Sequence, residues 1–103
     1  MSFNTVNATH YYADRIQTVT TTATAATIGL DIGPHIDEVV MSCTQDCHYK
    51  LGSEAELTAS PATTSDLPLF AGTYKPIRVK PGQRLSFIRA SVDGRAWVEE
   101  CTQ

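Results

Sequence analysis

The sequence has few charged residues and no long apolar run. Only 18% of its 103 residues are charged, against about 25% in typical soluble domains. No stretch approaches the ~18 apolar residues that a membrane-spanning helix needs, so we expect no membrane partner. Residues 1–7 also lack the basic start and the apolar run of a secretory signal. These features predict a protein that is made and assembled in a cytoplasm.

Basic residues are too few for a typical nucleic-acid-binding protein. The formal net charge is −3 and the pI is about 5.4, whereas nucleic-acid binders normally carry a basic patch. The basic side chains that do gather along the chain are Lys75, Arg78, Lys80, Arg84 and Arg89. Arg78 and Lys80 alternate with apolar residues and should therefore share one face of a strand. That face is either a solvated sheet exterior or a contact strip for an acidic partner surface.

Metal and disulfide chemistry are both weakly supported. Three cysteines are an odd number and a poor disulfide framework. Cys43, Cys47, His48 and Cys101 would supply four zinc ligands, but strand alternation points His48 away from Cys47. Buried free thiols are the leading interpretation, and oxidation of Cys43 to Cys47 across a short loop is the alternative. We expect no metal and no cofactor.

Catalytic groups are equally hard to assemble. The histidines fall on an expected arm, a turn and a strand, and none adjoins a recognisable nucleophile motif; they are His10, His35 and His48. The adjacent carboxylates at 37–38 and 99–100 should point to opposite faces of their strands. No glycine-rich phosphate loop is present. We therefore expect no catalytic residues and predict that the protein is not an enzyme.

Short strands and tight turns dominate the last third of the chain. Apolar and polar residues alternate over 74–80, 84–90 and 95–99, and the turns Pro81–Gln83 and Asp93–Gly94 separate these segments. This arrangement is typical of antiparallel strands joined by tight turns.

The earlier part of the chain continues the pattern. Residues 15–22 are rich in β-branched side chains and predict a strand, and 22–30 predict a strand edge or an irregular crossing. The apolar run Ile36–Cys43 predicts a central strand, and Thr44–Asp46 fits a short hairpin loop before the strand Cys47–Leu51.

A long polar connection follows, from Gly52 to Asp66, with Pro61 inside it. Connections of this length are uncommon in compact domains and often bind partners. Residues 67–72 re-enter the core, and Pro68 implies an edge strand or a bulge.

These segments predict an all-β fold of about seven strands without a helix. A single antiparallel β-sandwich, with jelly-roll connections as one option, is the natural solution. We expect the sandwich domain to cover residues 14–103 and an extended amino-terminal arm to cover 1–13. The arm carries aromatic side chains and is either a frayed tail or a segment that orders on a neighbouring subunit.

Two interpretations are possible for Trp97 on its terminal strand. It is the expected core anchor, and the alternative is a stacking platform for a sugar. A carbohydrate- or receptor-binding module would combine Trp97, Tyr74 and Tyr49 as stacking faces with Asp66 and Asp93 as hydrogen-bond partners.

A characteristic order of strands and turns covers about half of the chain, in the segments Tyr49–Gly52, Thr64–Leu69, Ala71–Thr73, Val79–Gly82 and Trp97–Glu99. This order resembles that of small virion proteins of tailed bacteriophages. The resemblance implies a β-sandwich structural protein of the phage particle, such as a head decoration (cement) protein or a small head–tail connector or tail component. It implies no catalytic residues.

The function expected from this resemblance is capsid decoration. A homotrimer would bind and stabilise the shell of major capsid protein, would be located in the virion, and would not bind nucleic acid. Loops 52–66 and 81–83 would face the shell, and the arm would order on an adjacent subunit. The expected contact residues are Phe3, His10, Tyr11, Tyr12, Pro61, Asp66, Arg78 and Lys80.

Overall fold

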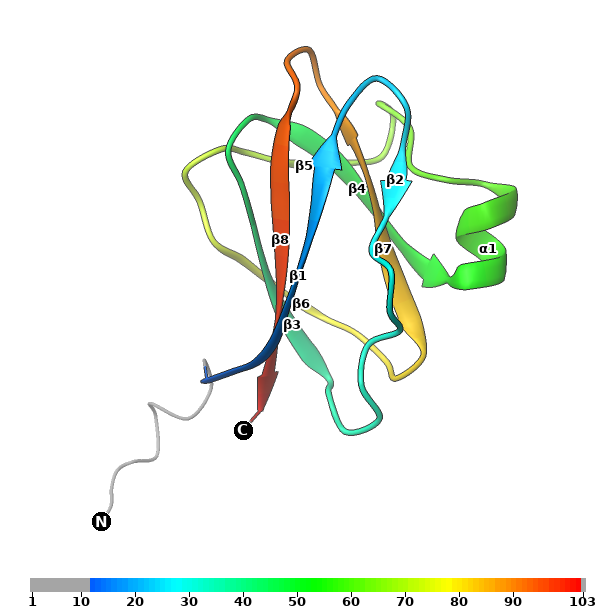
Figure 1. The fold of residues 1–103 in the computed structure, drawn as a ribbon, viewed down its shortest axis with the longest axis vertical. Coiled ribbons are helices and arrows are strands. Elements are labelled where there is room, and N and C mark those ends of the chain that lie inside the picture. The colour runs from blue at the N-terminus through cyan, green and yellow to red at the C-terminus, as the bar shows by residue number, and fades with distance from the viewer. Residues whose placement is uncertain (1–11, 103) are drawn as a thin grey trace.

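The computed structural model describes residues 12–102 of the chain (Figure 1). The described part contains eight strands and one short helix. In chain order they are β1 (Tyr12–Thr21), β2 (Ala26–Thr27), β3 (Glu38–Cys43), β4 (Cys47–Ser53), α1 (Glu54–Ala59), β5 (Leu67–Leu69), β6 (Lys75–Arg78), β7 (Gln83–Arg89) and β8 (Gly94–Thr102).

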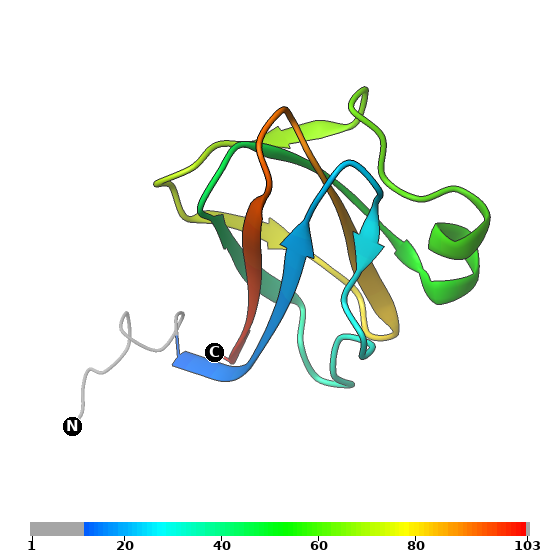
Figure 2. The same ribbon diagram turned by 45° about the horizontal axis from the view of Figure 1, so that its top comes forward.

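The strands form two four-stranded antiparallel sheets, ordered β1-β8-β3-β6 and β2-β7-β4-β5. The prediction of an all-β sandwich is confirmed. Every connection except β4 to β5 passes from one sheet to the other, and this is the connectivity of an eight-stranded jelly roll. Figure 2 shows the strands from a second direction.

The tight turns were predicted in the right places, but they do not close hairpins. β3 pairs with β6 and β8, whereas β4 pairs with β5 and β7. The predicted hairpin loop at 44–46 is therefore wrong, because it carries the chain between sheets. The turns at 81–83 and 93–94 do the same. Alternation assigns the two faces of a strand, but it does not say which strand lies beside it.

The core fills the space between the two inner faces. Each sheet contributes alternate residues, and the segment between β2 and β3 closes one end with three isoleucines. The buried apolar side chains of this cluster include Ile28, Ile32, Ile36, Val39, Met41, Cys47, Tyr49, Leu69, Leu85, Phe87, Ala96 and Val98. Residues 39 and 41 on β3, and 96 and 98 on β8, point inward, so their neighbours at 40, 42, 97 and 99 point outward.

Helix α1 lies inside the connection that was expected to be irregular. Ser53 is its N-cap: the Ser53 hydroxyl accepts from Glu56 N at 3.1 Å, and Glu56 Oε1 accepts from Ser53 N at 2.8 Å. This reciprocal capping box stabilises a helix start. Leu57 is 2% exposed and packs toward Gly52. One buried leucine and one cap therefore suffice for this six-residue helix.

The first strand begins earlier than expected. Tyr12 pairs with Thr102 and Ala13 with Cys101, and a bulge follows before Arg15. Both residues were assigned to the arm, but β8 is nine residues long and supplies them with strand partners. The other aromatic and histidine residues expected as arm anchors lie outside the described residues: Phe3, His10 and Tyr11.

Candidate binding surface

The outward side of the β2-β7-β4-β5 sheet is partly covered by the chain itself. Residues 54–66 pass over it, and α1 contacts β4 and β7 (Figure 1). Ala62 N donates to Ser86 Oγ at 3.1 Å, and Ser86 is fully buried as a result. His48 Nδ1 lies 3.0 Å from the carbonyl oxygen of Asp66. This side of the sandwich is therefore occupied by polar contacts within the protein.

The outward side of the β1-β8-β3-β6 sheet differs, because it presents large apolar and aromatic side chains to solvent. We call this surface the open face and define it by Ile16, Val40, Tyr74, Pro76, Trp97, Glu99 and Cys101. Tyr74 is 74% exposed and Ile16 is 54% exposed, and Trp97 is half-buried. Val40 and Cys101 are more than nine-tenths buried and lie on its floor.

Strand register aligns these residues in rows. Ile16 on β1 is opposite Glu99 on β8, which is opposite Val40 on β3, which is opposite Pro76 on β6. Trp97 occupies the next row beside Ser42. Four neighbouring strands thus contribute one outward residue each to the row centred on Glu99.

Trp97 is therefore not a core anchor, and that prediction is wrong. The residues on either side of it, Ala96 and Val98, are fully buried in the core. Because side chains alternate along a strand, Trp97 must project from the other face.

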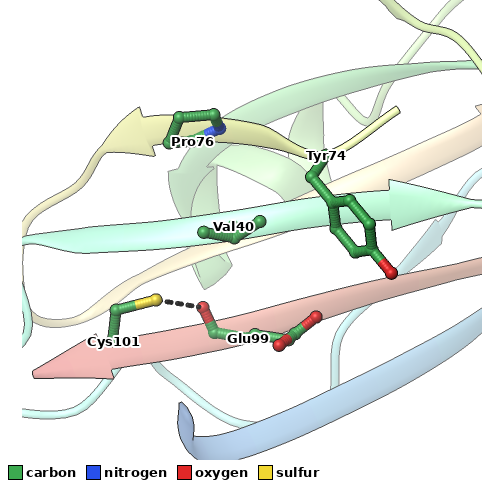
Figure 3. Close-up of a pocket in the computed structure, with 5 residues that line it drawn as sticks. All are labelled: Val40, Tyr74, Pro76, Glu99 and Cys101. Carbon is green, nitrogen blue, oxygen red and sulfur yellow. Dashed lines mark hydrogen bonds between the residues drawn. The ribbon is translucent and has the colours of Figure 1, made fainter. Parts of the chain in front are cut away.

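A groove crosses the middle of the open face. It has a volume of about 430 Å³ and is lined by Val40, Tyr74, Pro76, Glu99 and Cys101 (Figure 3). Figure 3 shows the Tyr74 ring extending from the chain just before β6 across β3 toward Glu99 on β8.

A second hollow, of about 320 Å³, adjoins the groove. Tyr74 and Glu99 line both depressions, and Ile16, Ser42 and Trp97 complete the second one. The two depressions therefore meet at the Tyr74 ring and the Glu99 carboxylate.

The groove carries negative charge. The Glu99 carboxylate has no ion pair and no hydrogen bond with any described residue. Burial raises the pKa of the Cys101 thiol, and the carboxylates of Glu38 and Glu99 raise that pKa further. Both carboxylates therefore act on the Cys101 thiol at this end of the groove.

The next residue, Glu100, has a different role on the inner side of the same strand. Its side chain is 4% exposed and forms an ion pair with Arg15, whose Nε donates to Glu100 Oε2 at 2.9 Å. Gly33 N also donates to the Glu100 carboxylate, at 3.4 Å. The prediction that these adjacent acids point to opposite faces is confirmed. Glu100 joins β1 and β8 to the segment after β2, and Glu99 remains available on the open face.

The predicted contact residues fall into two separate regions. Arg78 projects from β6 and is exposed, and its Nη1 lies 3.6 Å from Asp37 Oδ2. Lys80 is exposed just beyond β6. Pro61 and Asp66 belong instead to the segment that covers the opposite sheet, where Asp66 Oδ2 accepts from the backbone of residue 63 at 2.7 Å. The structure therefore does not bring the predicted loop and strand contacts together.

The cysteines are buried free thiols, as the leading interpretation predicted. Burial raises the pKa of all three, and that of Cys47 to about 12. Cys43 and Cys47 approach one another across the core from opposite sheets, while His48 points outward as expected. Among residues 12–102 no three His, Cys, Asp or Glu side chains are grouped closely enough to hold a metal ion.

The aromatic residues proposed for sugar stacking are divided in the structure. Tyr49 is 4% exposed and faces the core, with Lys75 Nζ 5.5 Å from its ring centroid. Tyr74 and Trp97 do share the open face. The sequence analysis did not identify Ile16, Val40 and Glu99 as members of an outward-facing site. A signal was present for β3 and β8, because apolar residues at consecutive positions indicate a strand that is apolar on both faces.

Comparisons with known proteins identify no relatives. No protein-family model, no curated protein and no solved structure matches the chain. In the part of the chain that the structure describes, no helix has the length and apolar character needed to cross a membrane.

Proposed function

We propose that the protein is a non-enzymatic structural component of a bacteriophage particle. In this proposal it is a capsid decoration protein that binds and stabilises the shell of major capsid protein. Jelly-roll sandwiches occur in viral capsid proteins and in lectins, but a fold alone does not assign a function. The observation that carries the proposal is the open face, on which apolar and aromatic side chains from four neighbouring strands surround a groove.

The open face has the composition of a protein interface. Aromatic side chains are enriched at the centres of interfaces, and tryptophan and tyrosine are frequent hot-spot residues. Here Trp97 and Tyr74 adjoin the same hollow, with Ile16 beside them. Exposed apolar patches on monomeric domains often mark interaction sites. On the opposite sheet, residues 54–66 cover part of the outward side. Exposed apolar side chains remain there at and just after the edge strand β5, at Leu67 and Phe70.

The centre of the open face is held by the sheet before any partner binds. β8 and β3 are the two interior strands of their sheet, so each is hydrogen-bonded on both sides. The backbone of such strands is already fixed and loses little freedom on binding. A preorganised surface of this kind lowers the entropic cost of association. A homotrimer on a symmetry axis of the shell would repeat this contact three times, and multivalency would then add to the affinity.

Co-sedimentation with shells tests the proposal. The purified protein would be incubated with particles assembled from the major capsid protein of the same genome, and bound protein would be quantified against concentration. We expect saturable binding at a fixed ratio to capsid subunits. The double variant Trp97→Ser/Tyr74→Ser should lose binding by at least about tenfold.

The matched control for this experiment is Leu67→Ser. Leu67 is 59% exposed but lies on β5 of the other sheet, so this variant should bind shells like the wild type. Circular dichroism would confirm that all variants keep their β structure. Absence of saturable binding by the folded wild-type protein would contradict the proposal.

Carbohydrate binding is the second candidate function. The observation that favours it is the hollow of about 320 Å³ in which Trp97 and Tyr74 adjoin Ser42 and Glu99, since aromatic rings beside polar groups suit sugar recognition. A glycan array would test it. Specific glycan binding that is lost in Trp97→Ala, together with no binding to shells, would replace the first candidate with this one.

A further inference from the structure

Glu99 is unusual among the acidic residues of this protein. Several other carboxylates have cationic partners: Asp31 lies 2.6 Å from Arg84, and Asp93 lies 2.6 Å from Arg89. Others accept hydrogen bonds from backbone N–H groups, as Asp66 does at 2.7 Å. Glu99 has neither an ion pair nor a hydrogen bond to its carboxylate within the described residues. With respect to the described residues, solvent is therefore the source of stabilisation for this carboxylate.

The surroundings of Glu99 are apolar. Its register neighbours are Ile16 on one side and Val40 on the other, and Pro76 follows Val40. Any partner that covers the open face removes water from the centre of this row. An ionised carboxylate that loses its water without gaining a partner is strongly destabilised. A surface that binds through this face must therefore bring hydrogen-bond donors to Glu99, and donors that carry a positive charge form the stronger hydrogen bonds.

The shape of the site favours arginine as that charge. The Trp97 and Tyr74 rings line the same hollow as the Glu99 carboxylate. A guanidinium group can form two parallel hydrogen bonds with a carboxylate and can also stack on aromatic rings, whereas the compact ammonium of lysine cannot form the paired contact.

We infer that the partner inserts an arginine side chain into the open face, where it pairs with Glu99 beside Trp97 and Tyr74. This inference rests on the proposed function, because it names the chemistry of the shell surface that the open face recognises. The negative charge of Glu99 favours a positively charged partner on the open face. Residues 1–11 contain neither lysine nor arginine, so the amino-terminal segment of a second copy cannot supply the guanidinium group.

A capped amino acid provides a direct probe. Isotope-labelled protein would be titrated with N-acetyl-arginine amide and, separately, with N-acetyl-citrulline amide, an uncharged compound of nearly the same shape. We expect the arginine probe to shift the backbone resonances of residues 40, 97 and 99 and the Trp97 indole resonance, with saturation in the millimolar range. The citrulline probe should produce at least about tenfold weaker binding.

Two variants make the assignment specific. Glu99→Gln keeps the size of the side chain and should abolish the difference between the probes. Glu54→Gln is the matched control, because Glu54 is an exposed carboxylate on α1, against the opposite sheet, and this variant should respond like the wild type. Equal shifts with both probes, or an unchanged response in Glu99→Gln, would overturn the inference.

Shell binding separates this inference from the proposed function. Glu99→Gln should bind shells at least about tenfold more weakly than the wild type, and Glu99→Arg should bind more weakly still, because like charges repel. If the wild type does not bind shells, the proposed function fails. If the wild type and Glu99→Gln bind shells equally, the function stands and the arginine contact is excluded. If Glu99→Gln instead causes an oligomer of this chain to dissociate, the open face is occupied by a second copy of the chain, and the inference also fails.

Discussion

Trp97 on β8 lies directly opposite Ser42 on β3, and both side chains project from the outward side of their sheet. The small serine leaves one flank of the indole uncovered. Both residues line the same hollow, and Tyr74 lines it from the β6 side. The single tryptophan of the chain therefore lies on the outward side of the sheet, where it is available to a partner.

The position of Trp97 predicts a specific fluorescence behaviour. Because the protein has one tryptophan, its emission reports this site alone. We expect acrylamide to quench the native emission, with an emission maximum between those of a core indole and a fully exposed indole, because Trp97 is half-buried. A strongly blue-shifted spectrum that resists quenching in the folded protein would contradict the surface position of Trp97.

Replacement of Arg15 should destabilise the protein more than replacement of its partner. Arg15→Met leaves the buried Glu100 carboxylate without its cation, and loss of one partner of a buried ion pair costs about 3 kcal/mol. Glu100→Gln should cost less, because the Arg15 side chain is 36% exposed and can be hydrated. Urea unfolding of both variants and of the double variant measures the coupling. Equal losses for the two single variants would argue against this account.

Gly82 is required by its backbone conformation. Its φ is +86°, and Gln83 N donates to Lys80 O at 3.2 Å, as in a type II turn with Pro81 and Gly82 at the centre. Gly82→Ala should lower the unfolding free energy by about 1–2 kcal/mol. Gly29→Ala is the matched control, because a Cβ at either glycine meets nothing within 4 Å and Gly29 has no positive φ. In thermal unfolding, Gly82→Ala should therefore have a clearly lower midpoint temperature than Gly29→Ala.

The thiols should be unreactive in the folded protein. Burial raises the pKa of Cys47 to about 12 and also raises that of Cys43 and Cys101. At pH 8 the reactive thiolate of Cys47 is therefore about a hundredfold or more scarcer than in an unfolded chain. We expect a disulfide reagent such as Ellman's reagent to label the three thiols only slowly until denaturant is added. Rapid labelling of native Cys47 would show that the core is not closed around it.

Sequence patterns located the strands well but not their partners. Alternation within 84–90 and 95–99 correctly indicated strands, and Pro81–Gly82 correctly indicated a turn. The sequence could not show to which sheet each strand belongs, because a turn between two sheets and a hairpin turn use the same short polar residues. The helix was not predicted, because the residues around it are as polar as those of a loop. Ser53 and Glu56 nevertheless have the spacing of a capping box.

The candidate binding surface was the least predictable part. β8 is apolar on both faces around Trp97, so alternation alone left open which face meets the core. Only the pairing of β8 with β1 and β3 shows that Ala96 and Val98 fill the core. The importance of Glu99 likewise depends on its apolar neighbours in the adjacent strands. Those neighbours are distant in sequence, and no local motif marks them.

The central claim is that the open face is the surface that binds the shell, and hydroxyl-radical footprinting read by mass spectrometry tests it most directly. Oxidation of side chains would be compared between the free protein and the protein bound to shells. We expect Trp97, Tyr74 and Ile16 to be oxidised in the free protein and protected in the complex. Leu30 and Leu67, which are 54% and 59% exposed elsewhere, should be oxidised equally in both states. Unchanged oxidation of Trp97 and Tyr74 in a saturated complex would contradict the claim.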